Sequence, residues 1–122
     1  MSYERVLKAL VNLGLLRKDA EIYVHLATEG PQESANIAKN LKLSRQQVGS
    51  SLLEMQGRKI VFPIPERITK FAAVPFEKTI MLLMKAEREE AERLEQSKTA
   101  ILNEWRLLTR QNNERKTTRA NF

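Results

Sequence analysis

The residues best suited to chemistry in this chain are hydrogen-bonding side chains in one short stretch, from residue 44 to residue 51. An arginine can bond the edge of guanine through two hydrogen bonds, a glutamine can do the same with adenine, and a serine hydroxyl can bond a phosphate. No acidic residue occurs between Ser44 and Leu53, although a solvated helix face is usually rich in glutamate. We expect this stretch to contact double-stranded DNA, with an ordinary exposed polar face as the alternative. Its candidate residues are Ser44, Arg45, Gln46, Gln47, Ser50 and Ser51.

Basic side chains elsewhere in the sequence suit contact with DNA phosphates. The chain has 21 lysines and arginines against 15 aspartates and glutamates, which gives a formal net charge of +6. Such a balance favours a polyanionic partner, with nucleic acid first and an anionic membrane surface second. The candidates for phosphate contact are Arg67, Lys70, Lys42 and Lys39, with Arg58 and Lys59 as weaker ones.

The residue types exclude most catalytic and metal chemistry. The chain has no cysteine and one histidine, His25, so it has no disulfide, thiolate metal site or cysteine nucleophile. Glutamates such as Glu87 and Glu90 are not accompanied by a Ser–His pair, a glycine-rich phosphate loop or metal-ligand spacing. We therefore expect no enzyme activity, no cofactor and no metal, and we interpret His25 as a partly buried structural residue.

The sequence also predicts a cytoplasmic protein without membrane contact. No stretch is long and apolar enough to cross a bilayer. The N-terminus lacks the apolar core of a signal peptide. The absence of cysteine fits a reducing compartment.

Helical periodicity and helix-end signals predict four helices in the first half of the chain. They cover about residues 3–13, 18–29, 33–40 and 45–58. Ser44 has the side-chain oxygen that an N-cap requires. In the fourth helix the side chains expected to face the core are Val48, Ser51, Leu52 and Met55, so Ser51 belongs both to this set and to the polar stretch.

Two extended runs follow the fourth helix, at residues 60–64 and 68–74. The polar link 65–67 between them is turn-like, so the pair predicts a β-hairpin. Pro63 and Pro65 cannot donate ladder hydrogen bonds, so the first run is expected to be a short strand or to lie at a sheet edge. After Pro75 no proline or glycine occurs up to about Arg110, and we expect one long helix there, with Pro75 at its start.

This long helix carries apolar residues in alternating steps of four and three, which is the pattern of a coiled coil. Glu87 and Lys98 are the two charged exceptions. We call this apolar stripe the seam. So small a domain cannot bury it, and we expect two copies of the chain to pair through it. The alternative is a helix that folds back on its own domain. The sequence leaves parallel and antiparallel pairing open. The expected interface residues are Met84, Ala91, Leu94, Ile101, Trp105 and Leu108.

The predicted order of elements describes a mostly α fold with a small β-hairpin, a winged helix-turn-helix followed by a dimerisation helix. In this arrangement the helix after the tight turn enters the major groove, and the hairpin, or wing, lies along the DNA backbone or in the minor groove. We expect residues 1–75 to form the DNA-binding domain and residues 76–110 the dimerisation helix. Residues 111–122 are expected to form a basic, disordered tail.

A series of short motifs resembles the DNA-binding domain of TrmB-like archaeal transcription regulators. The motifs are Leu13-Gly14-Leu15, Ala20-Glu21-Ile22-Tyr23, Gly30-Pro31, Ile37-Ala38, Leu43-Ser44-Arg45 with Val48, and Ala73-Val74-Pro75. The resemblance covers about Val11 to Met84 and implies a dimeric winged-helix protein that represses or activates transcription at promoters. The chain departs from the family pattern at Lys42 and Lys59, where the family usually has glycine. Larger members carry a sugar-sensing domain, which we do not transfer to this chain.

The function predicted from these observations is that of a dimeric, sequence-specific DNA-binding transcription regulator. One alternative is an architectural protein that coats or bridges DNA without sequence preference. Another is a protein-interaction module, in which the winged helix and the long helix dock onto a transcription complex.

Overall fold

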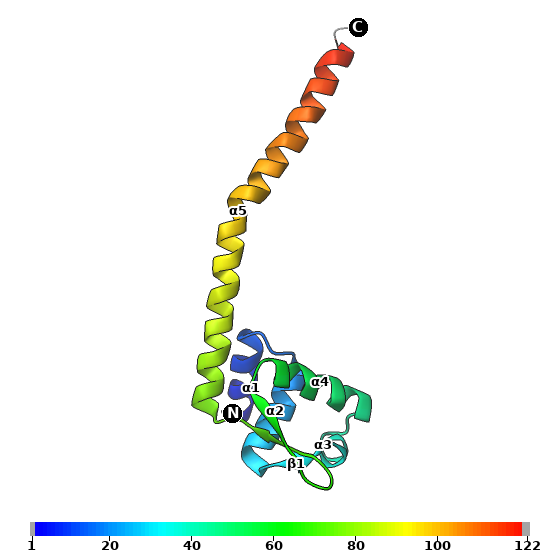
Figure 1. The fold of residues 1–122 in the computed structure, drawn as a ribbon, viewed down its shortest axis with the longest axis vertical. Helices are drawn as coiled ribbons and strands as arrows, with labels where there is room; N and C mark the ends of the chain where they lie inside the picture. The colour runs from blue at the N-terminus through cyan, green and yellow to red at the C-terminus, as the bar shows by residue number, and fades with distance from the viewer. Residues whose placement is uncertain (1, 121–122) are drawn as a thin grey trace. The chain divides into compact units, whose positions relative to one another are not determined.

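A computed structural model describes the backbone of residues 2–120 and the side chains of residues 2–113. The chain divides into two compact units, Met1–Glu87 and Arg88–Phe122. The first unit contains, in order, α1 (Ser2–Asn12), α2 (Arg17–Glu29), β1 (Gln32–Glu33), α3 (Ser34–Leu41), α4 (Arg45–Gly57), β2 (Val61–Ile64), β3 (Lys70–Ala73) and the first turns of α5 (Phe76–Ala120) (Figure 1). This mostly helical fold with a small antiparallel sheet confirms the predicted fold class.

Apolar side chains from all five helices form the core of the first unit. Each helix places residues three or four positions apart on one face, and these faces meet in the interior. The fully buried side chains include Leu7 and Leu10 of α1, Ile22 and Leu26 of α2, Ile37 of α3, Val48 and Met55 of α4, and Leu83 of α5. The core therefore fixes α4 and the start of α5 to the same body.

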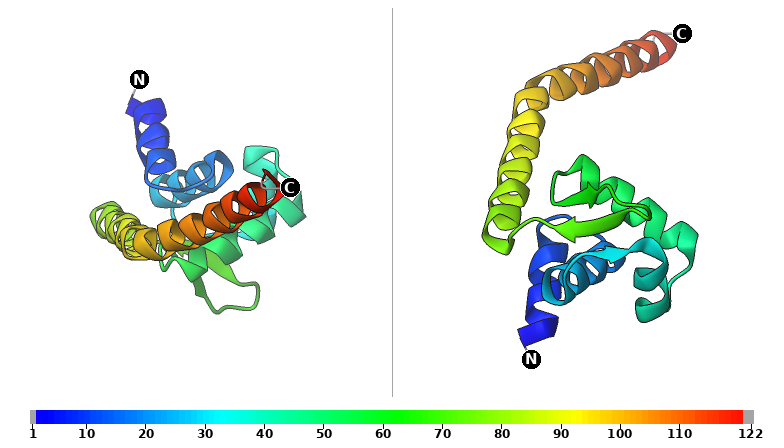
Figure 2. Two further views of the ribbon diagram at one scale, coloured as in Figure 1. Left: turned by 90° about the horizontal axis from the view of Figure 1, so that it is seen from above. Right: turned by 60° about the horizontal axis from the view of Figure 1, so that its bottom comes forward.

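The sheet has the strand order β1-β3-β2, and both pairings are antiparallel (Figure 2). Val61 faces Ala73 and Ile64 faces Lys70 in the hairpin, so the predicted hairpin is confirmed. Pro63 lies in β2, which is an edge strand, as its missing N–H requires. Strand β1 was not predicted, because two residues are too few to show an alternating pattern.

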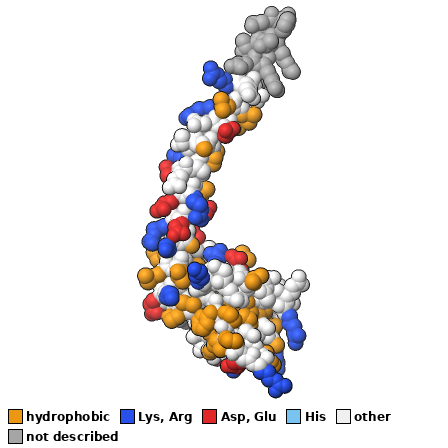
Figure 3. Space-filling view, viewed as in Figure 1, with side chains coloured by type: hydrophobic (Ala, Val, Ile, Leu, Met, Phe, Trp, Pro, Cys, Tyr) orange, Lys and Arg blue, Asp and Glu red, His pale blue; other side chains and the backbone are white. Residues whose placement is uncertain are grey.

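The second unit consists of the later turns of α5, along which apolar and charged side chains alternate (Figure 3). The helix continues to Ala120, whereas the sequence predicted an end near Arg110 and a disordered tail. No proline or glycine occurs between residues 111 and 120, so no residue in this stretch breaks the helix. Residues 121 and 122 of the predicted tail lie outside the described residues. No helix in the described part of the chain is long and apolar enough to cross a membrane.

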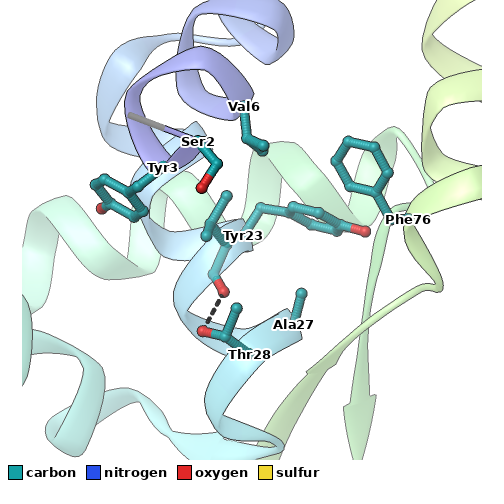
Figure 4. Close-up of a pocket in the computed structure, with 8 residues that line it drawn as sticks. Ser2, Tyr3, Val6, Tyr23, Ala27, Thr28 and Phe76 are labelled. Carbon is teal, nitrogen blue, oxygen red and sulfur yellow. Dashed lines mark hydrogen bonds between the residues drawn. The ribbon is translucent and has the colours of Figure 1, made fainter.

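Tyr23 joins α2 to the start of α5 in the first unit. Its side chain is buried, and its ring lies 6.5 Å from that of Phe76 (Figure 4). The hydroxyl donates a hydrogen bond to the carbonyl oxygen of Val74 at 2.5 Å, and the Thr79 hydroxyl donates to the same oxygen at 3.2 Å. Burial raises the pKa of the Tyr23 hydroxyl, and its interaction with Thr79 offsets part of this effect.

A Tyr23→Phe variant is expected to lose about 1 kcal/mol of unfolding free energy at neutral pH, because Val74 loses one of its two donors. The folded-state pKa of Tyr23 lies above its unfolded value of about 10. The contribution of this hydroxyl is therefore present below about pH 10 and is lost as pH rises through the folded pKa. Urea unfolding at about pH 7 and about pH 11 measures both effects. A stability gap between wild type and variant that stays the same at both pH values would contradict this account.

Candidate nucleic-acid interface

Helices α3 and α4 are joined by a tight turn of residues 42–44. Lys42 adopts the left-handed conformation, with φ 56°, and its backbone N–H donates to the Ala38 carbonyl. The Leu43 N–H donates to the same carbonyl at 3.0 Å. These bonds end α3 and reverse the chain, so that α4 begins at once. The turn and the first turns of α4 lie on the side of the first unit away from the start of α5 (Figure 1).

Ser44 and Gln47 fix the first turn of α4 through a capping box. The Ser44 Oγ accepts from the Gln47 backbone N–H at 3.0 Å, and the Gln47 Oε1 accepts from the Ser44 backbone N–H at 2.9 Å. Both residues were predicted to contact DNA, and both also hold the helix start in place. The sequence contains the signal for this second role, because a serine followed three residues later by glutamine is typical of a capping box.

The first two turns of α4 expose a face that carries no acidic residue. Arg45, Gln46 and Ser50 are exposed, and Gly49 between them leaves a gap without a side chain. The first carboxylate on the helix is that of Glu54, which is paired with a cation from the same helix end. The unbonded N–H groups at a helix start also favour an anion. This face therefore offers one cation, one amide and one hydroxyl to a partner.

Ser51 differs from the other residues of the predicted site. It is only 2% exposed, and its Oγ has no hydrogen-bond partner among the described residues. Its position three residues after Val48 places it on the inward face of α4. The prediction that Ser51 contacts DNA is therefore wrong.

Three of the basic residues predicted to contact phosphates are exposed and are not paired with a carboxylate. Lys39 lies in the last turn of α3, Lys42 in the turn, and Arg67 in the link between β2 and β3. None of the three forms an ion pair within the part of the chain that the structure describes. Each is therefore available to an anionic partner.

Two other predicted phosphate contacts are engaged within the fold. Lys70 lies 3.5 Å from the carboxylate of Glu66 on the same hairpin, which partly neutralises it. The Arg58 guanidinium donates to Glu54 at 3.2 Å and to the carbonyl oxygen of Gly14 at 3.2 Å. Arg58 therefore holds the end of α4 against the α1–α2 turn, a role that no local sequence pattern indicates.

Replacing Lys42 by glycine is expected to stabilise the fold and to weaken DNA binding at the same time. A left-handed conformation costs a lysine about 1 kcal/mol relative to glycine, so the variant gains up to about that amount. The loss of one phosphate contact is expected to lower affinity about threefold and to reduce the salt slope by about one. Thermal unfolding and binding titrations at several salt concentrations measure these effects.

Lys59→Gly provides a matched control, because Lys59 has φ 65° but follows the far end of α4. It should stabilise the fold similarly and change DNA affinity less. Unaltered binding by the Lys42→Gly variant would remove Lys42 from the interface.

Comparisons with known proteins identify the relatives of this chain. Residues 5–77 match the model of the family described as sugar-specific transcriptional regulator TrmB. No curated protein sequence shows significant similarity to the chain.

Solved structures with a similar fold include two proteins from named archaea and one chromatin protein. A possible transcriptional regulator from Methanosarcina mazei Go1 has a TM-score of 0.60 and 19% identity, over 77% of this chain and 83% of its own. A protein from the thermoacidophilic archaeon Sulfolobus tokodaii has a TM-score of 0.59 and 20% identity, over 76% and 99%. The archaeal chromatin protein TrmBL2, described as having a novel mode of DNA binding, has a TM-score of 0.70 and 22% identity, over 82% and 39%.

At these identities the solved structures show the fold alone, and the matched region spans well under half of TrmBL2. The family model, by contrast, matches more than half of the 122 residues and includes every residue of the predicted DNA-binding site. The chain therefore belongs to the TrmB family of transcriptional regulators.

Proposed function

We propose that this protein is a homodimeric transcription regulator that recognises a preferred DNA sequence with the first two turns of α4. The observation that carries the proposal is the exposed, acid-free face of Arg45, Gln46 and Ser50 on a helix that follows a tight turn. A helix in this position of a winged helix-turn-helix enters the major groove with its N-terminal residues at the base edges. In this docking mode we expect Arg67 and Lys42 to contact DNA phosphates.

The proposed dimer rests on the seam of α5. Ile101 and Trp105 are each 60% exposed, although their spacing is that of a coiled-coil core. A twofold dimer presents two recognition helices, about 34 Å apart if the half-sites are separated by one DNA turn. Two copies carry a net charge of +12, twice the +6 of one chain. With roughly 6–10 phosphates contacted, affinity should fall steeply as salt increases.

An architectural role is the second candidate. The description of TrmBL2 as a chromatin protein favours it, and so do Arg106 and Arg110 near the end of the described side chains. Arg115, Lys116 and Arg119, which follow in the expected basic tail, lie outside the described side chains. An architectural protein would use phosphate contacts alone, without base contacts from α4.

Selection of bound duplexes from a random pool, followed by footprinting of the full chain, tests the proposal. We expect one enriched motif with two related half-sites. Coverage of DNA without an enriched motif would support the architectural role instead. Failure to bind any duplex at low salt would overturn both and favour docking onto another protein.

A further inference from the structure

Two charged residues interrupt the apolar seam of α5, and they have opposite signs. Glu87 and Lys98 are both exposed. Neither forms an ion pair with any residue that the structure describes, whereas their neighbours Glu90 and Arg93 pair with each other. Neither charge is therefore balanced by an ion pair within the described chain, although the other seam positions are apolar.

We propose that two copies of α5 pair antiparallel, in the register that places Glu87 of each copy opposite the partner's Lys98. The inference rests on the dimer proposed above and adds its direction and register. In a coiled coil written as heptads a to g, Met84, Ala91, Lys98 and Trp105 occupy a positions, and Ile80, Glu87, Leu94, Ile101 and Leu108 occupy d positions. In antiparallel pairs each a residue faces a d residue of the other helix, and alternative registers differ by one heptad.

The register that joins Glu87 to the partner's Lys98 also places apolar pairs in the layers on either side. It places Met84 opposite the partner's Ile101 and Ala91 opposite the partner's Leu94. A shift of one heptad in either direction would set Glu87 against the partner's Trp105 or Ala91, with its charge facing an apolar group. Only one antiparallel register therefore matches both charges.

The residues that flank the seam point to the same arrangement. At the e positions this register sets Arg88 opposite the partner's Glu95, an attractive pair that occurs twice by symmetry. A parallel dimer would instead align Glu87 with the partner's Glu87 and Lys98 with the partner's Lys98, and it would bring Glu90 beside the partner's Glu95. Charges at a, e and g positions set the partner and orientation of coiled coils, and here they oppose the parallel form.

Disulfide crosslinking tests the register, because the chain has no cysteine of its own. Met84→Cys and Ile101→Cys chains of different tagged size are mixed, annealed and oxidised. We expect a disulfide between the two variants, and none when either variant or Leu108→Cys is oxidised alone. Self-linking of Leu108→Cys, with no mixed product, would overturn the antiparallel proposal while leaving the dimer intact. A chain that sediments as a monomer and forms no crosslink would overturn the dimer as well.

Charge reversal supplies a second readout that does not depend on cysteine geometry. Glu87→Lys and Lys98→Glu are each expected to weaken dimerisation about tenfold, because each creates two repulsive pairs, and the double variant should regain most of this loss. Glu92→Lys, which makes the same charge change off the seam, serves as the control. Single variants that dimerise as tightly as the wild type would contradict the proposal, since a parallel dimer keeps like charges facing in every case.

Discussion

An Arg45→Ala variant is expected to bind the preferred duplex of this protein about 5- to 150-fold more weakly, while its affinity for unrelated DNA changes by less than about threefold. The range corresponds to the loss of one two-bond contact with a base. Arg45 is exposed in the first turn of α4 and has no ion pair within the described chain, so its guanidinium is free to make such a contact. Fluorescence anisotropy at one fixed salt concentration, with the selected and a scrambled duplex, measures the effect.

Ser51→Ala is the matched control for this experiment. Ser51 lies on the same helix, but its side chain is buried and its hydroxyl has no partner among the described residues. Its removal should leave DNA binding unchanged and cost little stability, because no hydrogen bond is lost. If Arg45→Ala weakens binding to both duplexes equally, Arg45 contacts only phosphate and α4 does not select the sequence.

A Leu94→Asp variant is expected to weaken dimerisation by about 100-fold or more. In the proposed dimer Leu94 lies in the central layers of the seam, where the change removes two leucines and places two carboxylates in an apolar interface. Because Leu94 is 60% exposed in the single chain, the fold of each copy should persist. Affinity for a duplex with two half-sites should fall by a similar factor, whereas affinity for one half-site should not change. Sedimentation equilibrium and binding titrations measure these two effects.

Leu107→Asp separates the seam from general effects on α5. Leu107 is also more than half exposed, but it lies outside the a and d positions. This variant should remain dimeric and bind both duplexes as the wild type does. Equal dissociation of the two variants would show that the interface does not follow the heptad seam.

The helices and the hairpin could be predicted because their signals are local. Apolar spacing places Val48, Leu52 and Met55 on one face of α4, and the structure buries all three. Lys42, where the family usually has glycine, adopts the left-handed conformation, which a lysine does not itself predict. The match to the TrmB family model confirms the resemblance carried by the short motifs.

The remaining features depend on contacts that a local pattern does not contain. Arg58 donates a hydrogen bond to the carbonyl oxygen of Gly14, which lies 44 residues earlier in the chain. Its guanidinium is therefore engaged within the fold and not free for a DNA phosphate. Ser51 fits both the polar stretch and the inward face, and only the packing of α4 decides between them. Strand β1 exists because Gln32 and Glu33 pair with β3, not because of their own β preference.

Backbone amide NMR shifts during titration with the selected duplex test most directly whether α4 reads DNA. We expect the largest shift changes in residues 44–50, with smaller ones near Arg67 and Lys42, and little change at the buried Leu7 and Leu10. Shift changes confined to α5, with residues 44–50 unaffected by bound DNA, would show that α4 does not read DNA.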